Sequence, residues 1–368
     1  MNASNIPTTM RAVVLKRHGG LDALEFEAAW PVPQPGPQQV LIKVAATGMN
    51  NTDVNTRAGW YSKSVTEATT GEAYESLDGT ADNTWGGDGI KFPRIQGADV
   101  CGHVVAVGDE VGDDLIGKRV ITDNWLRNWD DPLNMHTTGY LGSEADGGYA
   151  EYCVIDHRNV AAVDSSLSDA ELATFSCSYS TAEGMLDKAG VGADDAVLVT
   201  GASGGVGGAL IQLAKRRGAT VVALAAPSKH ADVAKMGPDA ILERAPADLK
   251  GALRDAIGRD NVTVVADIAA GDYFGTIIDA LERGGRYVTS GAIAGPIVSL
   301  DVRTLYLMDL SFFGSTVNPP HTFRNLVSYI EAGEIKPMLA ATYALEDFHK
   351  GQEAFIEKKH TGNIVVVP

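Results

Sequence analysis

Val197-Leu-Val-Thr-Gly-Ala-Ser-Gly-Gly-Val-Gly-Gly-Ala-Leu-Ile-Gln-Leu-Ala-Lys215 is the stretch of sequence that decides the fold. An apolar run with the length of a buried parallel strand leads into glycines, and apolar residues then recur at helical spacing. Gly204 lets a phosphate approach the backbone, Gly207 lets the helix pack close to the strand, and the helix N-terminus attracts an anion. Ala202 replaces the first glycine of the usual G-x-G-x-x-G pattern, but strand, turn and helix supply the context that this motif demands. The sequence therefore predicts a dinucleotide site formed by Ser203, Gly204, Gly205, Val206 and Gly207.

The segment after the next predicted strand indicates which nucleotide binds. About twenty residues past the glycines, where an acid would hold a ribose hydroxyl of NAD, the chain has Ala225. Ser228 and Lys229 follow, and a hydroxyl and an ammonium group suit the 2′-phosphate of NADP. We therefore expect NADPH rather than NADH as the cofactor. The alternative is a solvated helix start in which Ser228 is simply the N-cap.

Length and charge restrict the class of protein and its partners. The 368 residues favour two domains, each large enough for a core of its own. With 47 acidic and 30 basic residues the formal net charge is −17, which argues against nucleic acid or an anionic membrane as a partner. No membrane span, signal peptide or disulfide framework is apparent. We expect a cytoplasmic protein that acts on a small-molecule substrate.

The pattern of apolar residues changes twice along the chain. Up to residue 160, short valine-rich runs bounded by glycine and proline predict a strand-rich domain. From residue 161, strands alternate with helices, which predicts an α/β fold with a doubly wound parallel sheet. The strands are expected at 196–200, 220–225, 239–242, 262–267 and 285–290. After Gly314 the pattern breaks, and a helix at 323–332 and the closing run at 362–367 return to the first domain. The predicted domains are 1–160 with 319–368, and 161–318.

More cofactor-binding residues are expected where the later strands end, because open α/β sheets bind ligands at the carboxyl ends of their strands. These residues are Ala269, Gly291, Ala292, Ser315 and Thr316. Asn363, near the C-terminus, is expected to close over the cofactor. The alternative for Asn363 is an ordinary turn residue.

A series of short motifs extends over nearly the whole chain. They are Met10-Arg-Ala-Val-Val-Leu, Gly48-Met-Asn-Asn-Thr-Asp53, Gly97-Ala-Asp-Val-Cys-Gly102, Gly147-Gly-Tyr-Ala-Glu-Tyr152, the glycine turn, Gly284-Gly-Arg-Tyr-Val288 and Gly362-Asn-Ile-Val-Val-Val. In this order they resemble the medium-chain dehydrogenase/reductase superfamily. The resemblance implies a GroES-like, β-rich catalytic domain built from both chain ends, a Rossmann domain between them, and an active site in the cleft that separates the two. Segments 297–302 and 311–314 resemble the strands through which this family pairs its Rossmann sheets, so we expect a homodimer.

The superfamily contains zinc alcohol dehydrogenases and zinc-free quinone or enone reductases. The resemblance puts the three catalytic zinc ligands of the first branch at Asn50, Ala98 and Cys177. Neither Asn50 nor Ala98 can replace a thiolate or an imidazole in a tetrahedral site, and the lobe that would hold a structural zinc has no cysteine. We therefore expect no metal. The alternative is a rebuilt site that combines Cys177 with Asp53 or Asp99.

Asparagine at position 50 resembles the zinc-free reductases, and Asp53 and Tyr61 follow it as candidate catalytic residues. Hydride transfer to an enone or quinone needs a hydrogen bond or a proton for the developing enolate oxygen. The Asn50 amide and the Tyr61 hydroxyl fit that need, since a phenol with a pKa of about 10 stays protonated at neutral pH. Asp53 is expected to orient the backbone rather than to transfer protons. The alternative is that Asn50 caps a turn and Tyr61 fills the cleft wall.

The segment 62–92 is longer than a compact connection and is expected to be a lid, with Trp85 near the substrate, or else a simple insertion. In the later lobe, Trp125, Trp129 and Tyr140 either wall the substrate cleft or pack the loop, and His136 is expected at the surface. Our hypothesis is an NADPH-dependent, zinc-independent reductase of quinones or α,β-unsaturated carbonyls. One alternative is an alcohol dehydrogenase or aldehyde reductase with an altered zinc site. The other is a non-catalytic NADPH-binding protein.

Overall fold

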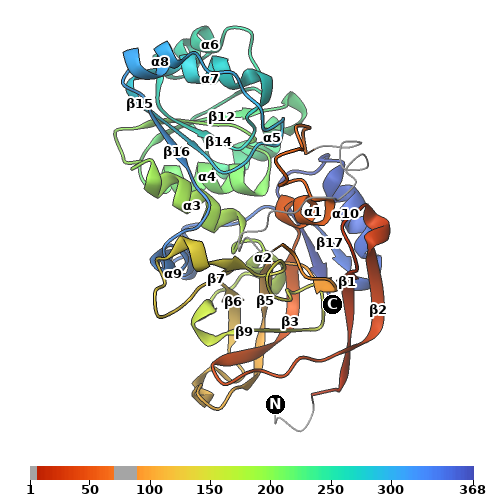
Figure 1. The fold of residues 1–368 in the computed structure, drawn as a ribbon. Coiled ribbons are helices and arrows are strands. Elements are labelled where there is room, and N and C mark those ends of the chain that lie inside the picture. Colours follow the sequence, from red (N-terminus) through yellow and green to blue (C-terminus); the bar gives the residue numbers. More distant parts are fainter. Residues whose placement is uncertain (1–5, 70–88) are drawn as a thin grey trace. The chain divides into compact units, whose positions relative to one another are not determined.

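The computed structural model describes residues 6–69 and 89–368, which form two compact units (Figure 1). The first comprises the described parts of Met1–Val65, Gly71–Cys177 and Pro319–Pro368, and the second those of Thr66–Thr70 and Ser178–Asn318. The sequence placed the boundary after residue 160, whereas the units divide after Cys177. Residues 161–177 join the first unit because the short helix α2 (Asp169–Leu172) packs on strands of its sheet.

The first unit is built around a seven-stranded sheet in which β10, β6, β5, β3, β18 and β17 are neighbours in that order, and β9 also pairs with β3. Strand β3 (Gln39–Gly48) alternates its side chains between two cores: Val40 and Ile42 belong to one, and Leu41 belongs to the other. The last strand of the chain, β18 (Asn363–Val367), pairs antiparallel with β3. A β-rich domain built from both chain ends is therefore confirmed.

The other elements of the first unit complete its two cores. They are β1 (Thr9–Leu15), β2 (Leu24–Pro31), α1 (Asn51–Ala58), β4 (Arg94–Ile95), β5 (Asp99–Val107), β6 (Arg119–Thr122), β7 (Trp125–Leu126), β8 (Gly139–Tyr140), β9 (Tyr152–Asp156), β10 (Val160–Ala162), α9 (Pro320–Glu331), β17 (Leu339–Ala344) and α10 (Phe348–Ile356). Helix α10 packs on β17 and β18.

The second unit is a six-stranded parallel sheet with the strand order β13, β12, β11, β14, β15, β16. Its elements are α3 (Ser178–Lys188), β11 (Ala196–Val199), α4 (Gly205–Arg216), β12 (Thr220–Ala225), α5 (His230–Val233), β13 (Ala240–Glu243), α6 (Leu249–Ile257), β14 (Val262–Asp267), α7 (Phe274–Asp279), β15 (Leu281–Thr289), α8 (Val302–Leu307) and β16 (Ser311–Gly314). Helices cover both faces of the sheet (Figure 1). The predicted doubly wound Rossmann sheet is confirmed, and every residue of β11 is buried, as expected for a strand covered on both faces.

One prediction about the far edge of this sheet is wrong. Residues 311–314 do form a strand, β16, but residues 297–301 do not. Asp301 instead caps α8, because its side chain accepts a hydrogen bond from the backbone N–H of Arg303. Among the described residues, no helix is long and apolar enough to cross a membrane.

Candidate active site

The glycine turn forms the N-terminus of α4, directly after β11. Gly204 is the N-cap, and no side chain caps this helix end. At Gly207 an added Cβ would lie 2.2 Å from the carbonyl oxygen of Gly201, so the packing of α4 requires glycine there. At Gly204 an added Cβ would meet nothing nearer than the same oxygen at 3.6 Å, so the fold itself does not require glycine. Open space above a helix N-terminus suits a phosphate group, and Ser203, Gly205 and Val206 lie in the same turn.

The end of β12 carries no acid. Ala225 is its last residue and is buried, and the Nε2 atom of His230 lies 3.1 Å from the Ala225 carbonyl oxygen. Ser228 is exposed and Lys229 half-buried in the following turn, where burial lowers the pKa of Lys229. The segment is a solvated helix start, since α5 begins at His230, but Ser228 is not its N-cap, because the N-caps here are Ala226 and Lys229. Because β11 and β12 are parallel neighbours, this turn and the glycine turn share one edge of the sheet.

The remaining predicted cofactor residues of the second unit lie at this same edge. Ala269 follows β14, Gly291 and Ala292 follow β15, and Ser315 and Thr316 follow β16. The loops are joined by backbone hydrogen bonds, from Ala294 N to the Ala269 carbonyl and from Ser315 N to the Thr289 carbonyl, both at 2.8 Å. Ser315 is buried, yet its Oγ has no hydrogen-bond partner among the described residues. A buried hydroxyl without a partner and an open glycine turn both fit a bound dinucleotide.

In the first unit, Asn50 is the N-cap of α1 and is fixed by two carboxylates. Asp53 accepts a hydrogen bond from the Asn50 backbone N–H at 2.9 Å, as in a capping box. The Asn50 side chain donates from Nδ2 to Oδ2 of Asp99 at 3.0 Å. Asp53 also accepts the hydroxyl hydrogen of Tyr149 at 2.7 Å. All four side chains are buried, so both the backbone and the amide of Asn50 are held in place.

Asp99 is the centre of this group of polar side chains. Its other carboxylate oxygen accepts hydrogen bonds from Nδ2 of Asn124, at 3.3 Å, and from the backbone N–H of Cys177. Burial raises the pKa of Asp99 to about 7 and that of Asp53 to about 6, against the opposing effect of their hydrogen bonds. Both carboxyl groups therefore titrate close to neutral pH.

Two tyrosines lie near this group. Tyr61 follows α1 and hydrogen-bonds with Thr52 and Asn55. Burial raises the pKa of its phenol, and the nearby charges of Cys177 and Asp53 raise it further. Tyr61 therefore keeps its proton at neutral pH, as a donor must. The hydroxyl of Tyr140 accepts a hydrogen bond from Asn124 at 3.2 Å and also contacts Cys177.

Sequence reasoning did not identify all of these residues. It did not single out Asn124 or Tyr149, although Tyr149 lies in the motif Gly147-Gly-Tyr-Ala-Glu-Tyr152, and it treated Tyr140 only as a loop aromatic. Asn363 begins β18, where its neighbour Ile364 accepts a backbone hydrogen bond from Met49 at 2.9 Å. Asn363 therefore belongs to the same unit as Asn50, and its role toward a cofactor stays a prediction.

Two of the three residues at the zinc positions, Asn50 and Ala98, do not fit a zinc ion, and only Cys177 carries a thiol. Ala98 has no donor atom, the Asn50 amide is bound to Asp99, and both oxygens of Asp99 already accept hydrogen bonds. Asp53 is likewise engaged by Asn50 and Tyr149. Within the described part of the chain, no three His, Cys, Asp or Glu side chains gather closely enough to hold a metal ion.

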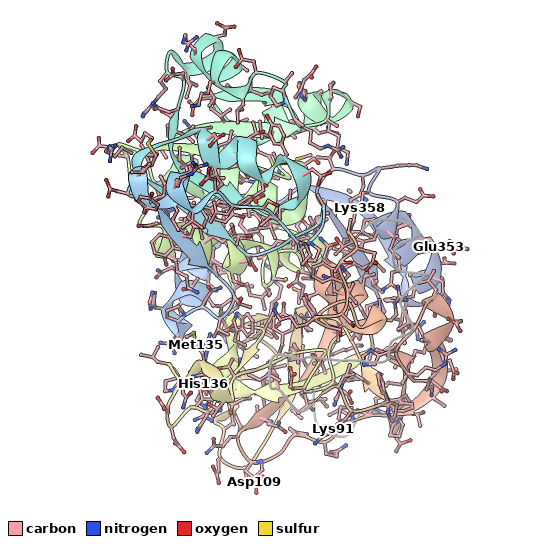
Figure 2. All side chains as sticks on the ribbon, turned by 45° about the horizontal axis from the view of Figure 1, so that its top comes forward. Lys91, Asp109, Met135, His136, Glu353 and Lys358 are labelled. Atoms are coloured by element: carbon pink, nitrogen blue, oxygen red, sulfur yellow. The ribbon has the colours of Figure 1, made fainter. Side chains whose placement is uncertain are left out.

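The long insertion is described only at its two ends, and Trp85 lies outside the described residues. At its start, the Thr69 N–H donates to the carbonyl of Ile293 at 3.0 Å, in the loop after β15. In the later lobe, Trp125 packs edge-on against Tyr140, with 4.9 Å between ring centroids. His136 lies in an exposed turn beside Met135, both labelled in Figure 2.

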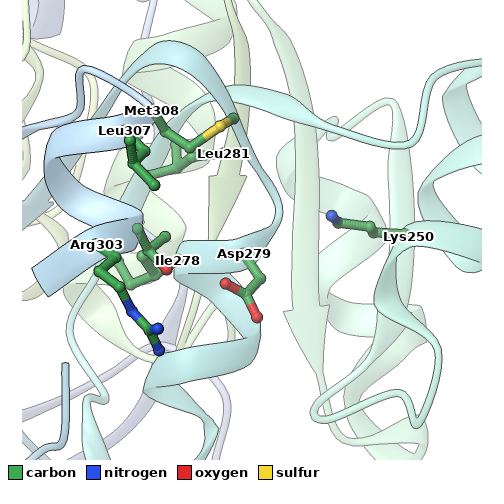
Figure 3. A pocket seen from close by; sticks show the side chains of 8 residues that line it. Lys250, Ile278, Asp279, Leu281, Arg303, Leu307 and Met308 are labelled. Atoms are coloured by element: carbon green, nitrogen blue, oxygen red, sulfur yellow. The ribbon is translucent and has the colours of Figure 1, made fainter. Parts of the chain in front are cut away.

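A hollow of about 440 Å³ in the second unit is lined by none of these residues (Figure 3). Its lining includes Lys250, Asp279, Leu281, Arg303, Leu307 and Met308. Leu281 is the first residue of β15, so the hollow lies at the amino ends of the strands, opposite the edge that carries the predicted cofactor residues. We therefore do not assign it to the cofactor.

Comparison with known proteins connects both units to one superfamily. Residues 36–165 match the family model described as alcohol dehydrogenase GroES-like domain, and residues 205–332 match the model described as zinc-binding dehydrogenase. The NAD-dependent alcohol dehydrogenase of Sulfurisphaera tokodaii is 28% identical over 92% of this chain and 95% of its own length. The human quinone oxidoreductase is 25% identical over 97% of this chain and 98% of its own length.

A solved structure is also similar to this chain over nearly its whole length. A putative alcohol dehydrogenase from Sinorhizobium meliloti superposes with a TM-score of 0.90 and is 44% identical, covering 99% of this chain and 98% of its own. A GroES-like domain and a Rossmann domain with a glycine turn define a nicotinamide-dependent oxidoreductase. The chain belongs to the medium-chain dehydrogenase/reductase superfamily.

Proposed function

We propose that the protein is an NADPH-dependent, zinc-independent reductase of quinones or α,β-unsaturated carbonyl compounds. The observation that carries the proposal is the hydrogen bond from Asn50 to Asp99, in a site where two of the three zinc positions carry no zinc ligand. A Lewis acid is replaced there by an amide that is fixed to the fold and can donate a hydrogen bond to a substrate oxygen. The relative named quinone oxidoreductase supports this assignment.

The chemistry needs a hydride, a hydrogen-bond donor and a proton. When bound, a reduced nicotinamide supplies the hydride, which adds to the β-carbon of an enone or to a quinone. Asn50 Nδ2 has two N–H donors, of which one serves Asp99, and the second stabilises the enolate oxygen. Tyr61 provides the proton, and Asp53 acts as a positioning residue through its bond to the Asn50 backbone.

The cofactor is held by the second unit. The glycine turn, Ser203 to Gly207, binds the pyrophosphate, and Ser228 and Lys229 bind the 2′-phosphate. The residues after β14, β15 and β16 flank the nicotinamide, with the buried Ser315 hydroxyl as a hydrogen-bond donor. Asn363 closes over the cofactor from its position at the start of β18.

The relatives named alcohol dehydrogenase favour a second candidate function. In it, the protein oxidises alcohols or reduces aldehydes through an altered metal site that includes Cys177. Elemental analysis of protein purified without a metal-affinity tag, combined with an assay of NADPH and NADH oxidation on quinones, enals and aldehydes, separates the two. Less than a tenth of an equivalent of zinc together with turnover of quinones or enals supports our proposal. Stoichiometric zinc with alcohol or aldehyde activity refutes it, and NADPH binding without hydride transfer to any acceptor leaves a non-catalytic binding protein.

We also propose that the protein is a homodimer. Large apolar side chains are exposed together on residues 297–307, with Ile297 at 68%, Val302 at 61% and Tyr306 at 60% exposure. The segment precedes β16, the edge strand of the parallel sheet. Sedimentation velocity on the wild type and on Tyr306→Lys tests the assignment: we expect a dimer that the substitution dissociates, and a monomeric wild type refutes it.

A further inference from the structure

A buried carboxylate, Asp267, joins three strand ends at the edge of the sheet that carries the predicted cofactor residues. It is the last residue of β14 and is fully buried. Its Oδ1 accepts the hydroxyl hydrogen of Thr200, which follows β11, at 2.5 Å. Its Oδ2 accepts the hydroxyl hydrogen of Tyr287, on β15, at 2.8 Å. The carboxylate therefore ties together three neighbouring strands, β11, β14 and β15, close to their carboxyl ends.

The same carboxylate holds the loop that follows it. The Ala269 N–H donates to Oδ1 of Asp267 at 2.8 Å, and the Ala270 N–H lies 3.2 Å from each carboxylate oxygen. The Ile268 N–H donates to Oγ1 of Thr200 at 3.0 Å. Three successive backbone N–H groups thus have buried side-chain acceptors, which give the loop one defined shape.

That shape is not one that the loop would adopt by itself. Ala270 has φ 53° and ψ −134°, a conformation that residues with a side chain rarely adopt and that persists only where the surroundings impose it. At the next residue, Gly271, an added Cβ would lie 2.7 Å from the Cβ of Ala294. The loop is therefore pressed against the segment that follows Gly291 and Ala292.

We propose that Asp267 and Thr200 are positioning residues for the nicotinamide end of the cofactor. They hold residues 268–271 in their strained shape and, through the contacts of that loop, set the position of Gly291 and Ala292. This inference rests on the proposed cofactor site at this edge of the sheet. Neither side chain touches the cofactor itself, and the adenosine half binds elsewhere, at the turns after β11 and β12.

The test compares two ligands that share the adenosine half. Dissociation constants for NADPH and for adenosine 2′,5′-bisphosphate are measured by calorimetry on the wild type, Asp267→Ala, which removes both carboxylate oxygens, and Thr200→Val. We expect NADPH binding about tenfold weaker in both variants, and adenosine 2′,5′-bisphosphate binding within about twofold of the wild type. Tyr287→Phe is the matched control, because it removes a hydrogen bond from the same carboxylate but none from the loop, and it should leave the ratio of the two constants unchanged.

A second substitution tests whether the loss of NADPH affinity arises from the strained backbone of Ala270. Glycine adopts the conformation of Ala270 without cost to a side chain, so Ala270→Gly added to Asp267→Ala should restore NADPH affinity to within about threefold of the wild type. Equal weakening of both ligands, unchanged NADPH binding, or no restoration by Ala270→Gly overturns the inference. A wild type that binds neither NADPH nor NADH instead refutes the proposed function, before any variant is measured.

Discussion

Substitution by alanine should destabilise the fold at Gly207 but not at Gly204, although both glycines lie in the same turn. Gly207→Ala places a methyl group 2.2 Å from the Gly201 carbonyl oxygen and 2.7 Å from the Cα of Ala202, which are backbone atoms that cannot rotate away. Helix α4 must then move off the turn, at a cost of about 3 kcal/mol, the upper end of the usual range for overpacking. In a unit of this size such a loss lowers the melting temperature by about 6 to 12 °C.

Gly204→Ala should leave the fold nearly unchanged. The residue has φ −88° and ψ 174°, which alanine adopts freely, and the new methyl group meets no atom nearer than 3.6 Å. Alanine is a poorer N-cap than glycine by about 0.5–1 kcal/mol, but it restricts the unfolded chain by a similar amount. The two effects offset each other, so we expect a melting temperature within about 2 °C of the wild type.

The affinity for NADPH should fall in Gly204→Ala, the variant whose melting temperature stays nearly unchanged. The methyl group of Gly204→Ala occupies the space that we assign to the pyrophosphate, so NADPH should bind at least about tenfold more weakly, which corresponds to about 1.4 kcal/mol. Calorimetric titration with NADPH and differential scanning calorimetry measure the two effects separately. Unchanged NADPH binding by Gly204→Ala would show that the pyrophosphate lies elsewhere, and equal losses of stability in both variants would refute the steric argument.

Three further predictions concern single side chains. Lys229→Ala should raise the KM for NADPH by about tenfold and leave the KM for NADH unchanged, because only NADPH carries the 2′-phosphate. Tyr61→Phe should lower kcat by about a hundredfold without changing the dissociation constant of NADPH, since it removes the proposed proton donor but no cofactor contact. Asp99→Asn should remove a contribution that makes stability fall as the pH rises between about pH 4 and pH 7, as measured by urea denaturation at several pH values.

The sign of the last prediction follows from the pKa. Burial raises the pKa of Asp99 to about 7 in the folded chain, while an unfolded aspartate has a pKa of about 3.9. Between these values the folded state binds more protons, so this group makes stability fall as the pH rises and exerts its full penalty above about pH 7. An unchanged slope in Asp99→Asn would contradict the raised pKa. An equal rise in the KM for NADPH and for NADH would contradict the prediction for Lys229→Ala. A kcat equal to that of the wild type would contradict the prediction for Tyr61→Phe.

Local patterns were sufficient to predict the Rossmann sheet. Strands β11, β12 and β14 lie where the apolar runs predicted them, because a strand covered on both faces is apolar throughout. The edge of the sheet was harder: the resemblance to the superfamily put a strand at 297–302, but most of the side chains in this segment are exposed and Asp301 caps a helix. A resemblance carries over the strands of relatives, and this segment departs from them.

Local spacing by itself predicted only part of the candidate site, and the superfamily resemblance was needed to put Asn50 and Cys177 together. Asn50 and Asp53 are three residues apart, the spacing of a capping box, so their mutual contact follows from sequence. Asp99 is distant in sequence and approaches Asn50 because β5 pairs with β3 in a register that opposes Asp99 to Gly48. Asn124 reaches the same carboxylate from beyond β6. Such long-range register depends on the whole sheet, so no short motif encodes it.

The group at the centre of this site is a carboxylate, that of Asp99, whereas the centre of a zinc site is a cation. A catalytic zinc is a cation surrounded by electron-pair donors, and it fixes those ligands in space. Here an anion is surrounded by hydrogen-bond donors: the Asn50 amide, the Asn124 amide and the Cys177 backbone N–H. A cation at Asp99 would compete with these donors for the carboxylate oxygens, and at Oδ2 it would compete with Asn50. In our proposal the fixed arrangement comes from the buried carboxylate, and the substrate oxygen meets an oriented N–H group in place of a metal ion.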